Sequence, residues 1–317
     1  MLRKIFFNIL VIGLLFAQSV CADERRGGFV LAFDDGYASW INIIAPELSR
    51  VGGVATGYVN NQRIHSGMIS FDDLRRLQNS YGWEIGTHAY DHFDPTIFIE
   101  LHGMSSWMKK ELEASVAELE SHGLRISSLV FPFNKYTKEL AVEVLKRMET
   151  YRKAEFYPIA SGKREDGSIP GVQTGTGSFI PLKQLFEWID IAHEKNELLF
   201  LYGHEVLPDN EFVSGTVTSV EERDLIAQNR IRSLSSPYLC LAPDTNRQIQ
   251  FAHIRVKNIE GNRVKVLNGD LTSLSKPGAT FLVGPCNAMR LSDFRAMIKY
   301  ASGKLKFLTV HEAVNRR

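Results

Sequence analysis

The sequence has little of several features that would restrict its function. Lysine and arginine together number 37 and aspartate and glutamate 36, so the formal net charge is only +1. The two signs are interspersed, which gives no reason to expect a nucleic acid or an anionic membrane as a partner. The sequence has no heptad pattern, low-complexity tract or internal repeat. These absences argue against a long coiled coil and against a repeat protein.

Long hydrophobic runs are also absent, except near the start of the chain. Two basic residues precede an apolar stretch at 5–17, and small residues lead up to Ala22. This pattern predicts a signal peptide at 1–22, and its apolar stretch is too short to span a bilayer comfortably. We therefore expect an exported protein, periplasmic or secreted, with no stable membrane insertion after cleavage. Lipid anchoring at Cys21 is the alternative, which the poor lipobox before it disfavours.

Cysteine is scarce, with three in the whole chain. Two of them, Cys240 and Cys286, remain after removal of a signal peptide. In an oxidising compartment they could form a disulfide. Two buried free thiols are the alternative, because the sequence does not give the distance between them.

The sequence does contain an alternation of short apolar segments and amphipathic ones. Strands are predicted at 29–33, 54–59, 83–87, 128–133, 151–156, 198–202 and 305–310. Helices are predicted between them, at 41–48, 70–77, 107–119, 138–148, 182–193 and 291–300. Residues 161–177 are rich in glycine, serine and charge, so they predict a loop. This alternation is typical of a parallel sheet or an α/β barrel.

The alternation stops after about residue 207 and returns near the end of the chain. In between, residues 221–234 predict a charged helix. Segments typical of β-structure follow at 248–251 and 264–267, with a turn at 260–262 between them. The expected main domain therefore comprises 23–207 and 288–317, and a partly β-rich insertion occupies 208–287.

Two carboxylates stand at the end of the first predicted strand, in Phe33-Asp34-Asp35-Gly36. Neighbouring carboxylates repel each other, and an adjacent apolar strand disfavours their ionisation. A bound metal or a catalytic task would account for such a pair. Taken alone, however, the two residues are better explained as a solvated Asp-Gly turn.

Three histidines follow other predicted strands. His88 and His92 come after the strand at 83–87, and His204 comes after the strand at 198–202. The C-terminal ends of strands in an α/β barrel converge on one face, so these side chains are expected near the two aspartates. Two neutral imidazoles and one carboxylate can bind a divalent metal and leave a position for water. The alternatives are surface histidines, or buried ones with hydrogen-bond partners.

Together these elements resemble the polysaccharide deacetylase family, carbohydrate esterase family 4, whose domain is the NodB-homology domain. The matching motifs, in order, are at 33–36, 87–92, 128–134 and 201–204, and the closing strand is at 306–314. The resemblance covers about 23–207 and 288–317. It implies an α/β fold, a deformed (β/α) barrel, and a metal-dependent enzyme that removes N-acetyl groups from amino sugars of a glycan.

The resemblance also implies a role for individual residues. The implied metal ligands are Asp35, His88 and His92, with zinc the usual divalent metal. Asp34 would be the general base and His204 the general acid. The implied substrate contacts are Tyr90, Phe131, Pro132 and Phe133, and a backbone N–H near Phe133 would face the oxyanion.

Two positions depart from the family pattern. The third motif often carries an arginine that braces the base, and Val130 stands there. Arg63 or Arg152 could substitute for it, although the sequence places neither. The aspartate that orients the acid histidine has no clear match.

Two rival functions are a hydrolase of another amide on the same fold and a catalytically silent glycan-binding protein. The intact candidate residues argue against the silent protein. The insertion would be a packing appendage, or a module that binds carbohydrate or a partner and narrows the groove. The lack of a visible aromatic ladder favours the appendage. The sequence leaves the glycan and the oligomeric state open.

Overall fold

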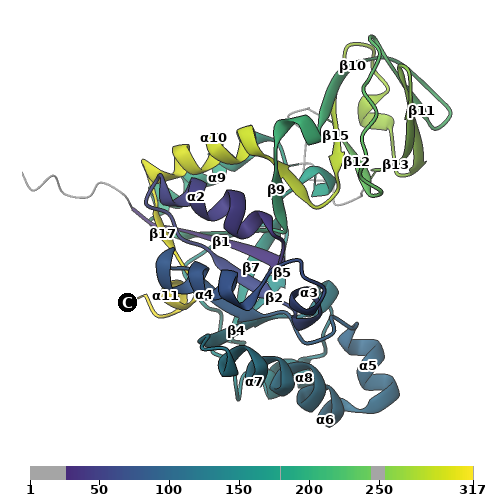
Figure 1. Cartoon of the computed structure of the whole chain (residues 1–317). Coiled ribbons are helices and arrows are strands. Elements are labelled where there is room, and N and C mark those ends of the chain that lie inside the picture. The colour runs from purple at the N-terminus through teal and green to yellow at the C-terminus, as the bar shows by residue number, and fades with distance from the viewer. Residues whose placement is uncertain (1–25, 179, 244–253, 317) are drawn as a thin grey trace, which may run out of the picture.

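The computed structural model describes residues 26–178, 180–243 and 254–316. The predicted signal peptide at 1–22 and the predicted strand at 248–251 lie outside the described residues. The described part of the chain forms two barrels (Figure 1). Within it, no helix combines the length and the apolar character that crossing a membrane requires.

The first barrel is a ring of seven parallel strands, which closes because β8 pairs with β1. The strands of the ring are β1 (Gly28–Asp35), β2 (Thr56–Val59), β3 (Glu84–Thr87), β4 (Ile126–Val130), β5 (Thr150–Ala154), β7 (Ser168–Gln173) and β8 (Leu198–Gly203). Two further strands pair at its edges, β17 (Lys306–Leu308) with β1 and the short β6 (Ile159–Ala160) with β8. The predicted (β/α) barrel is confirmed.

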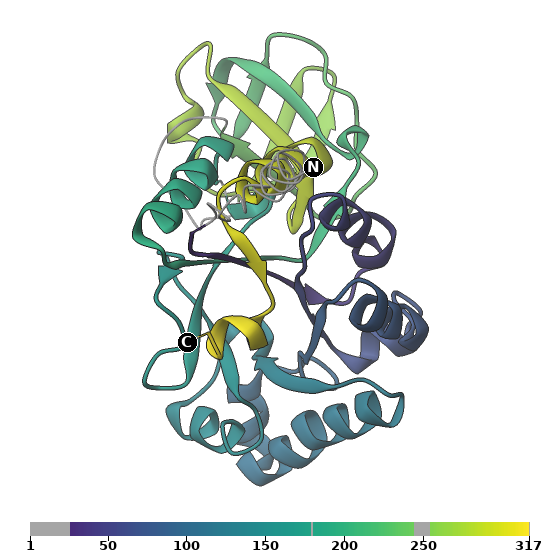
Figure 2. The same ribbon diagram turned by 90° about the vertical axis from the view of Figure 1, so that its left-hand side faces the viewer.

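Helices surround this ring (Figure 2). They are η1 (Trp40–Ile44), α2 (Ala45–Ser49), α3 (Asn61–His65), α4 (Phe71–Ser80), α5 (Pro95–His102), α6 (Met104–Trp107), η2 (Met108–Glu113), α7 (Ala114–Ser121), α8 (Lys138–Val144), α9 (Leu182–Lys195), α10 (Leu291–Ser302) and α11 (Val310–Val314). The start of α4 is fixed by a capping box, in which Ser70 and Asp73 each accept a backbone N–H from the other.

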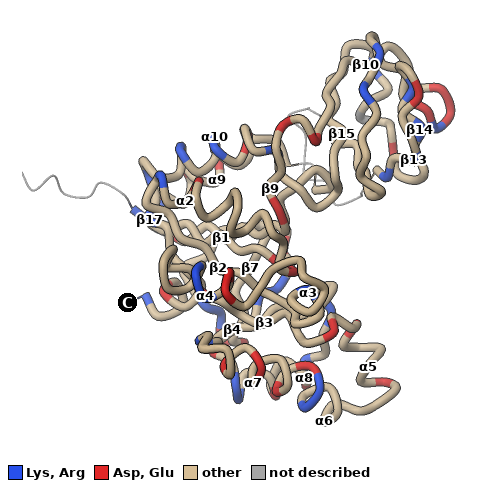
Figure 3. Tube along the Cα trace, in the orientation of Figure 1, with Lys and Arg blue, Asp and Glu red and all other residues tan. Residues whose placement is uncertain are grey.

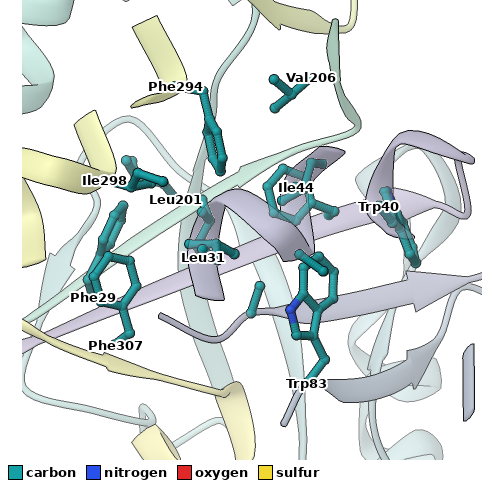
Figure 4. Packing of buried hydrophobic residues seen from close by; sticks show 14 of the residues in the cluster. Phe29, Leu31, Trp40, Ile44, Trp83, Leu201, Val206, Phe294, Ile298 and Phe307 are labelled. Carbon is teal, nitrogen blue, oxygen red and sulfur yellow. The ribbon is translucent and has the colours of Figure 1, made fainter. Parts of the chain in front are cut away.

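Alternate side chains of β1 point to opposite sides of the strand, as the geometry of a strand requires. Phe29 and Leu31 face outward and belong to one buried cluster with helix residues such as Phe294 and Ile298 (Figure 4). Val30 and Ala32 belong to a different cluster, formed mainly by side chains of the other ring strands. The even-numbered positions of β1 therefore face the inside of the ring.

Strand β7 corrects the expectation of a loop at 161–177. Pro170 and Gly171 resemble a turn in the sequence, but they lie in a buried strand that pairs with both β5 and β8. Gly171 is needed for close packing, because a Cβ there would lie 2.6 Å from Cδ of Arg152.

The second barrel consists of antiparallel strands and closes on itself. Around it run β10 (Val213–Glu221), β11 (Asp224–Ala227), β14 (Arg263–Asn268), β13 (Ile254–Glu260), β12 (Leu239–Pro243) and β15 (Thr280–Pro285). The predicted helix at 221–234 is wrong, because β10 and β11 form a hairpin around Glu222, whose φ is 53°. The charged residues of this hairpin resemble the polar face of a helix in the sequence.

The two barrels meet near a disulfide between Cys240 and Cys286, whose Cα atoms lie 4.8 Å apart. The Cys286 carbonyl accepts a 2.8 Å hydrogen bond from the N–H of Gly177, in the short turn η4 (Thr176–Ser178) that precedes α9. Strands β9 (Glu205–Leu207) and β16 (Ala288–Arg290) also pair at this junction. Charges of both signs are distributed over both barrels (Figure 3).

Candidate active site

The two carboxylates at the end of β1 differ in their position relative to the ring. Asp34 has the same parity as Val30 and Ala32, so its side chain enters the ring. Asp35 follows with a φ of 79°, and the chain then turns at Gly36. A Cβ at Gly36 would lie 2.8 Å from Cγ2 of Val59, so this turn requires glycine.

Asp35 lies beside both histidines of the second motif. Its Oδ1 is 3.6 Å from Nε2 of His88 and 3.4 Å from Nε2 of His92. The two Nε2 atoms are 3.1 Å apart. One ligand atom from each of the three residues lies within 4.8 Å of the others, so this group can hold a metal ion.

The contacts and the protonation of the two histidines are compatible with metal binding. Nδ1 of His88 lies 2.8 Å from the Val130 carbonyl, which fixes the ring and directs Nε2 toward Asp35 when Nδ1 carries the proton. Burial, together with the neighbouring His88, lowers the pKa of His92 to about 4. At neutral pH His92 is therefore an uncharged imidazole, the form that binds metals.

The lowered pKa of His92 predicts a pH-dependent stability. In the unfolded chain His92 has a pKa near 6.5, whereas in the folded protein its pKa is about 4. Between these values the unfolded state binds more protons, so the metal-free protein loses stability as the pH falls from about 6.5 to about 4. Thermal unfolding of chelator-treated protein across this range measures the slope, which His92→Gln should flatten. The exposed His102→Gln variant is the control, and equal slopes in all three proteins would contradict the prediction.

Asp34 is held by a buried arginine of β5. Arg152 donates from Nη1 to Oδ1 at 2.7 Å and from Nη2 to Oδ2 at 2.6 Å. Asp34 and Arg152 are 3% and 2% exposed. Burial alone would raise the pKa of Asp34, but the Arg152 guanidinium outweighs burial and holds this pKa below its usual value. Asp34 is therefore ionised at neutral pH.

Arg152 occupies the place of the arginine that the family pattern puts at the position of Val130 in the third motif. The bracing arginine comes from β5, and its guanidinium carbon lies 3.5 Å from the ring centre of Tyr202. Arg63 contacts the other aspartate instead, with Nη2 3.7 Å from Oδ2 of Asp35. The sequence signal for Arg152 is its position inside the strand predicted at 151–156, because an arginine that such a strand buries needs a partner.

His204 follows β8 and is partly buried. Its backbone carbonyl accepts a 2.8 Å hydrogen bond from Nε1 of Trp40. Among the described residues, its buried Nδ1 has no hydrogen-bond partner, in keeping with the missing orienting aspartate. Burial lowers the pKa of His204, although Asp34 and Asp35 act in the opposite direction.

One cleft of about 960 Å³ contains all five of the predicted metal-binding and catalytic residues. They are Asp34, Asp35, His88, His92 and His204. Phe131 and Phe133 also line it, and the Phe133 ring lies 4.7 Å from that of His92.

Two predicted substrate contacts are not part of this lining. Pro132 is buried in the short turn that follows Phe131, and the hydroxyl of Tyr90 lies 3.4 Å from Nε2 of His65. A smaller cavity of about 310 Å³, near Arg290, holds none of the predicted site residues.

Backbone strain is concentrated around this cleft. Among the described residues, seven non-glycine residues have a positive φ. Four of them line the cleft, namely Asp35, His92, Phe133 and Asn134. Such conformations cost free energy and persist where the surrounding structure enforces them, which is common at functional sites.

At the strand ends of a parallel barrel, three converging potential metal ligands, a carboxylate held by an arginine and a histidine together form a candidate hydrolytic site. Residues 22–151 match the sequence model of a family described as polysaccharide deacetylase. The resemblance seen in the motifs is thereby confirmed, and the match supports a hydrolytic deacetylase. Arg152 and His204 lie beyond the matched residues.

Other comparisons give weaker likenesses. No curated protein matches the chain. Among solved structures, one described as a T48 deacetylase with substrate is 18% identical, with 57% of this chain and 76% of that chain covered and a TM-score of 0.39. A peptidoglycan deacetylase, PdaC from Bacillus subtilis, is 17% identical, with 58% and 77% covered and a TM-score of 0.38. A family 4 carbohydrate esterase from Streptomyces lividans is 14% identical, with 56% and 79% covered and a TM-score of 0.39. Likenesses this low carry no argument about activity.

Proposed function

We propose that this protein is an exported, metal-dependent hydrolase that removes N-acetyl groups from amino sugars of a glycan. The observation that carries the proposal is the meeting of the Asp35, His88 and His92 group with the Asp34–Arg152 pair in one cleft. Export is supported by the signal-peptide pattern at 1–22 and by the disulfide, since disulfides persist in oxidising compartments.

Asp35, His88 and His92 would hold the metal, and we propose zinc because carboxylate and imidazole ligands suit it. When bound, such a metal supplies a Lewis acid and lowers the pKa of water. Three protein ligands of mixed type are also the usual number at a catalytic zinc site. Each of these ligands comes from a residue at or just after a strand end of the ring.

Asp34 would act as the general base. Its low pKa keeps it ionised, and the two hydrogen bonds from Arg152 fix the direction of the carboxylate. It would accept a proton from the attacking water as the oxygen bonds to the amide carbon. Because its pKa is low, Asp34 would keep this proton only briefly.

His204 would act as the general acid. As the bond between the carbonyl carbon and the nitrogen breaks, the amine would take a proton from the His204 ring, and acetate would leave. Burial holds the pKa of His204 below its usual value, and the nearby carboxylates of Asp34 and Asp35 act in the opposite direction, toward the protonated ring. Phe131 and Phe133 would form the apolar side of the substrate groove, and Pro132 would fix the turn between them.

Acetate release tests this function. Purified protein supplied with zinc is expected to release acetate from N-acetylglucosamine oligomers, and a chelator is expected to stop it. Bound metal without acetate release would favour a hydrolase of another amide. Neither metal nor acetate release would favour a glycan-binding protein without activity.

A further inference from the structure

The second barrel forms one wall of the catalytic cleft. Tyr238, Arg255 and Asn268 line the cleft together with the site residues of the first barrel. The cleft volume of about 960 Å³ is at the upper end of the ~300–1,000 Å³ range of ligand sites. The cleft therefore has room for a ligand larger than one sugar unit.

This wall is fixed to the first barrel. Cys286 donates its N–H to the carbonyl of Tyr238 at 3.0 Å, and its own carbonyl accepts a hydrogen bond from Gly177. The disulfide joins Cys286 to Cys240, which stands opposite Arg255 in the β12–β13 pair. A wall held in this way is preorganised, which reduces the ordering cost when a ligand binds.

Arg255 is the charged residue of this wall, within the ranges that the structure describes. Its guanidinium carbon lies 4.8 Å from the ring centre of Tyr238, which is 63% exposed. The backbone N–H of Arg255 donates to Oδ1 of Asn268 at 3.3 Å. Its side chain forms no ion pair with a described residue, and its buried Nε has no hydrogen-bond partner among them.

We propose that Arg255 binds a carboxylate on the substrate, so that the substrate is an acidic glycan. The proposal rests on the deacetylase function proposed above. A guanidinium presents parallel N–H donors that match a carboxylate, and a buried donor without a partner costs free energy until one arrives. With the acidic group held by Arg255 on the second barrel, the N-acetyl group would lie at the metal-binding side of the cleft.

Paired acidic and esterified glycans test this proposal. The first probe is a tetrasaccharide of alternating glucuronic acid and N-acetylglucosamine, and the second is an oligomer of N-acetylglucosamine and N-acetylmuramic acid, whose carboxylate is on a lactyl ether. Each is compared with its methyl ester, which keeps the shape and removes the charge. The zinc-loaded protein is expected to show about tenfold lower KM for the acid than for the ester in at least one pair, the effect of one charge-assisted contact.

The variant Arg255→Gln is expected to remove this preference for acid over ester. Lys257→Gln is the matched control, because Lys257 is an exposed cation on the same strand outside the cleft lining, and it should keep the preference. Equal KM values for acid and ester in both pairs would overturn the proposal. So would a preference that Arg255→Gln retains.

Failure of the proposed function gives a different pattern. In that case no acetate is released from these glycans or from neutral N-acetylglucosamine oligomers. Calorimetric binding of each acid and ester to the full chain, with and without Arg255→Gln, then decides the inference by the same comparison. Acetate release from neutral oligomers, without any acid preference, leaves the deacetylase function standing and overturns the role of Arg255.

Discussion

Replacing Arg152 by glutamine is expected to abolish deacetylation and to lower the free energy of unfolding by about 3–5 kcal/mol. Arg152 and Asp34 are both buried and share two short hydrogen bonds. Without the guanidinium, burial would raise the pKa of Asp34, so the carboxyl would become protonated and could not accept a proton. Acetate release and urea denaturation measure the two effects.

Two further variants separate charge from packing. The double variant Asp34→Asn/Arg152→Gln should regain much of the lost stability, because it buries no unpaired charge, and should stay inactive. Arg152→Lys should be intermediate, because lysine cannot donate two parallel hydrogen bonds. Wild-type turnover in Arg152→Gln would contradict the bracing role. A double variant as unstable as Arg152→Gln would trace the loss to packing against Tyr202.

The Asp34–Arg152 pair also makes the stability of the folded protein depend on pH in the acid range. The folded pKa of Asp34 lies below its unfolded value, so the pair contributes its full stability above the unfolded pKa of about 3.9. This contribution is lost as the pH falls through the folded pKa. The wild type should therefore lose more stability in acid than the double variant does.

The variants Asp35→Asn and His88→Ala are expected to lose metal binding and acetate release together. Each variant removes one of three converging ligand atoms. Substituting a residue that only supports a metal ligand costs ~10–100-fold in metal affinity. Removing a ligand itself should therefore lower the affinity by more than this. Asp34→Asn should keep the metal and lose about 10²–10⁴-fold in turnover, the usual contribution of a general base. Metal content after dialysis and acetate release are measured on the same samples.

A matched histidine variant controls for this test. His102 is exposed on α5, outside the cleft, so His102→Ala should keep both metal and activity. Normal deacetylation by Asp34→Asn would remove Asp34 from the role of base. Metal retained by His88→Ala with full occupancy would remove His88 from the ligand set.

The ends of the ring strands that precede the candidate site residues can be predicted from the sequence, because these strands are short, apolar and clearly bounded. Asp34, Asp35, His88, His92 and His204 were placed near one another on that basis, and the structure brings them into one cleft. Arg152 could not be placed, because its contact with Asp34 crosses the inside of the ring. Such a contact depends on which strands face each other, and local sequence patterns do not contain that information.

The errors in the predicted elements have a local cause. The strand β7 contains Pro170 and Gly171, which normally interrupt a strand but are accommodated here between two buried neighbours. The segment after Glu221 has the charge pattern of an exposed helix but forms a hairpin in the second barrel. The contribution of Arg255 to the cleft was not visible either, because it depends on how the two barrels meet.

The pairing of β1 also determines the order in which the site can form during synthesis. One edge of β1 pairs with β8, and the start of its other edge pairs with β17, whose residues follow the whole second barrel in the sequence. Contacts between residues so distant in sequence require closing a very long loop, which slows folding. Strands of the second barrel pair mostly with closer neighbours and can form before β17 is available. The strand that carries both aspartates precedes every other described strand, yet it obtains its full set of partners only after the second barrel has been synthesised.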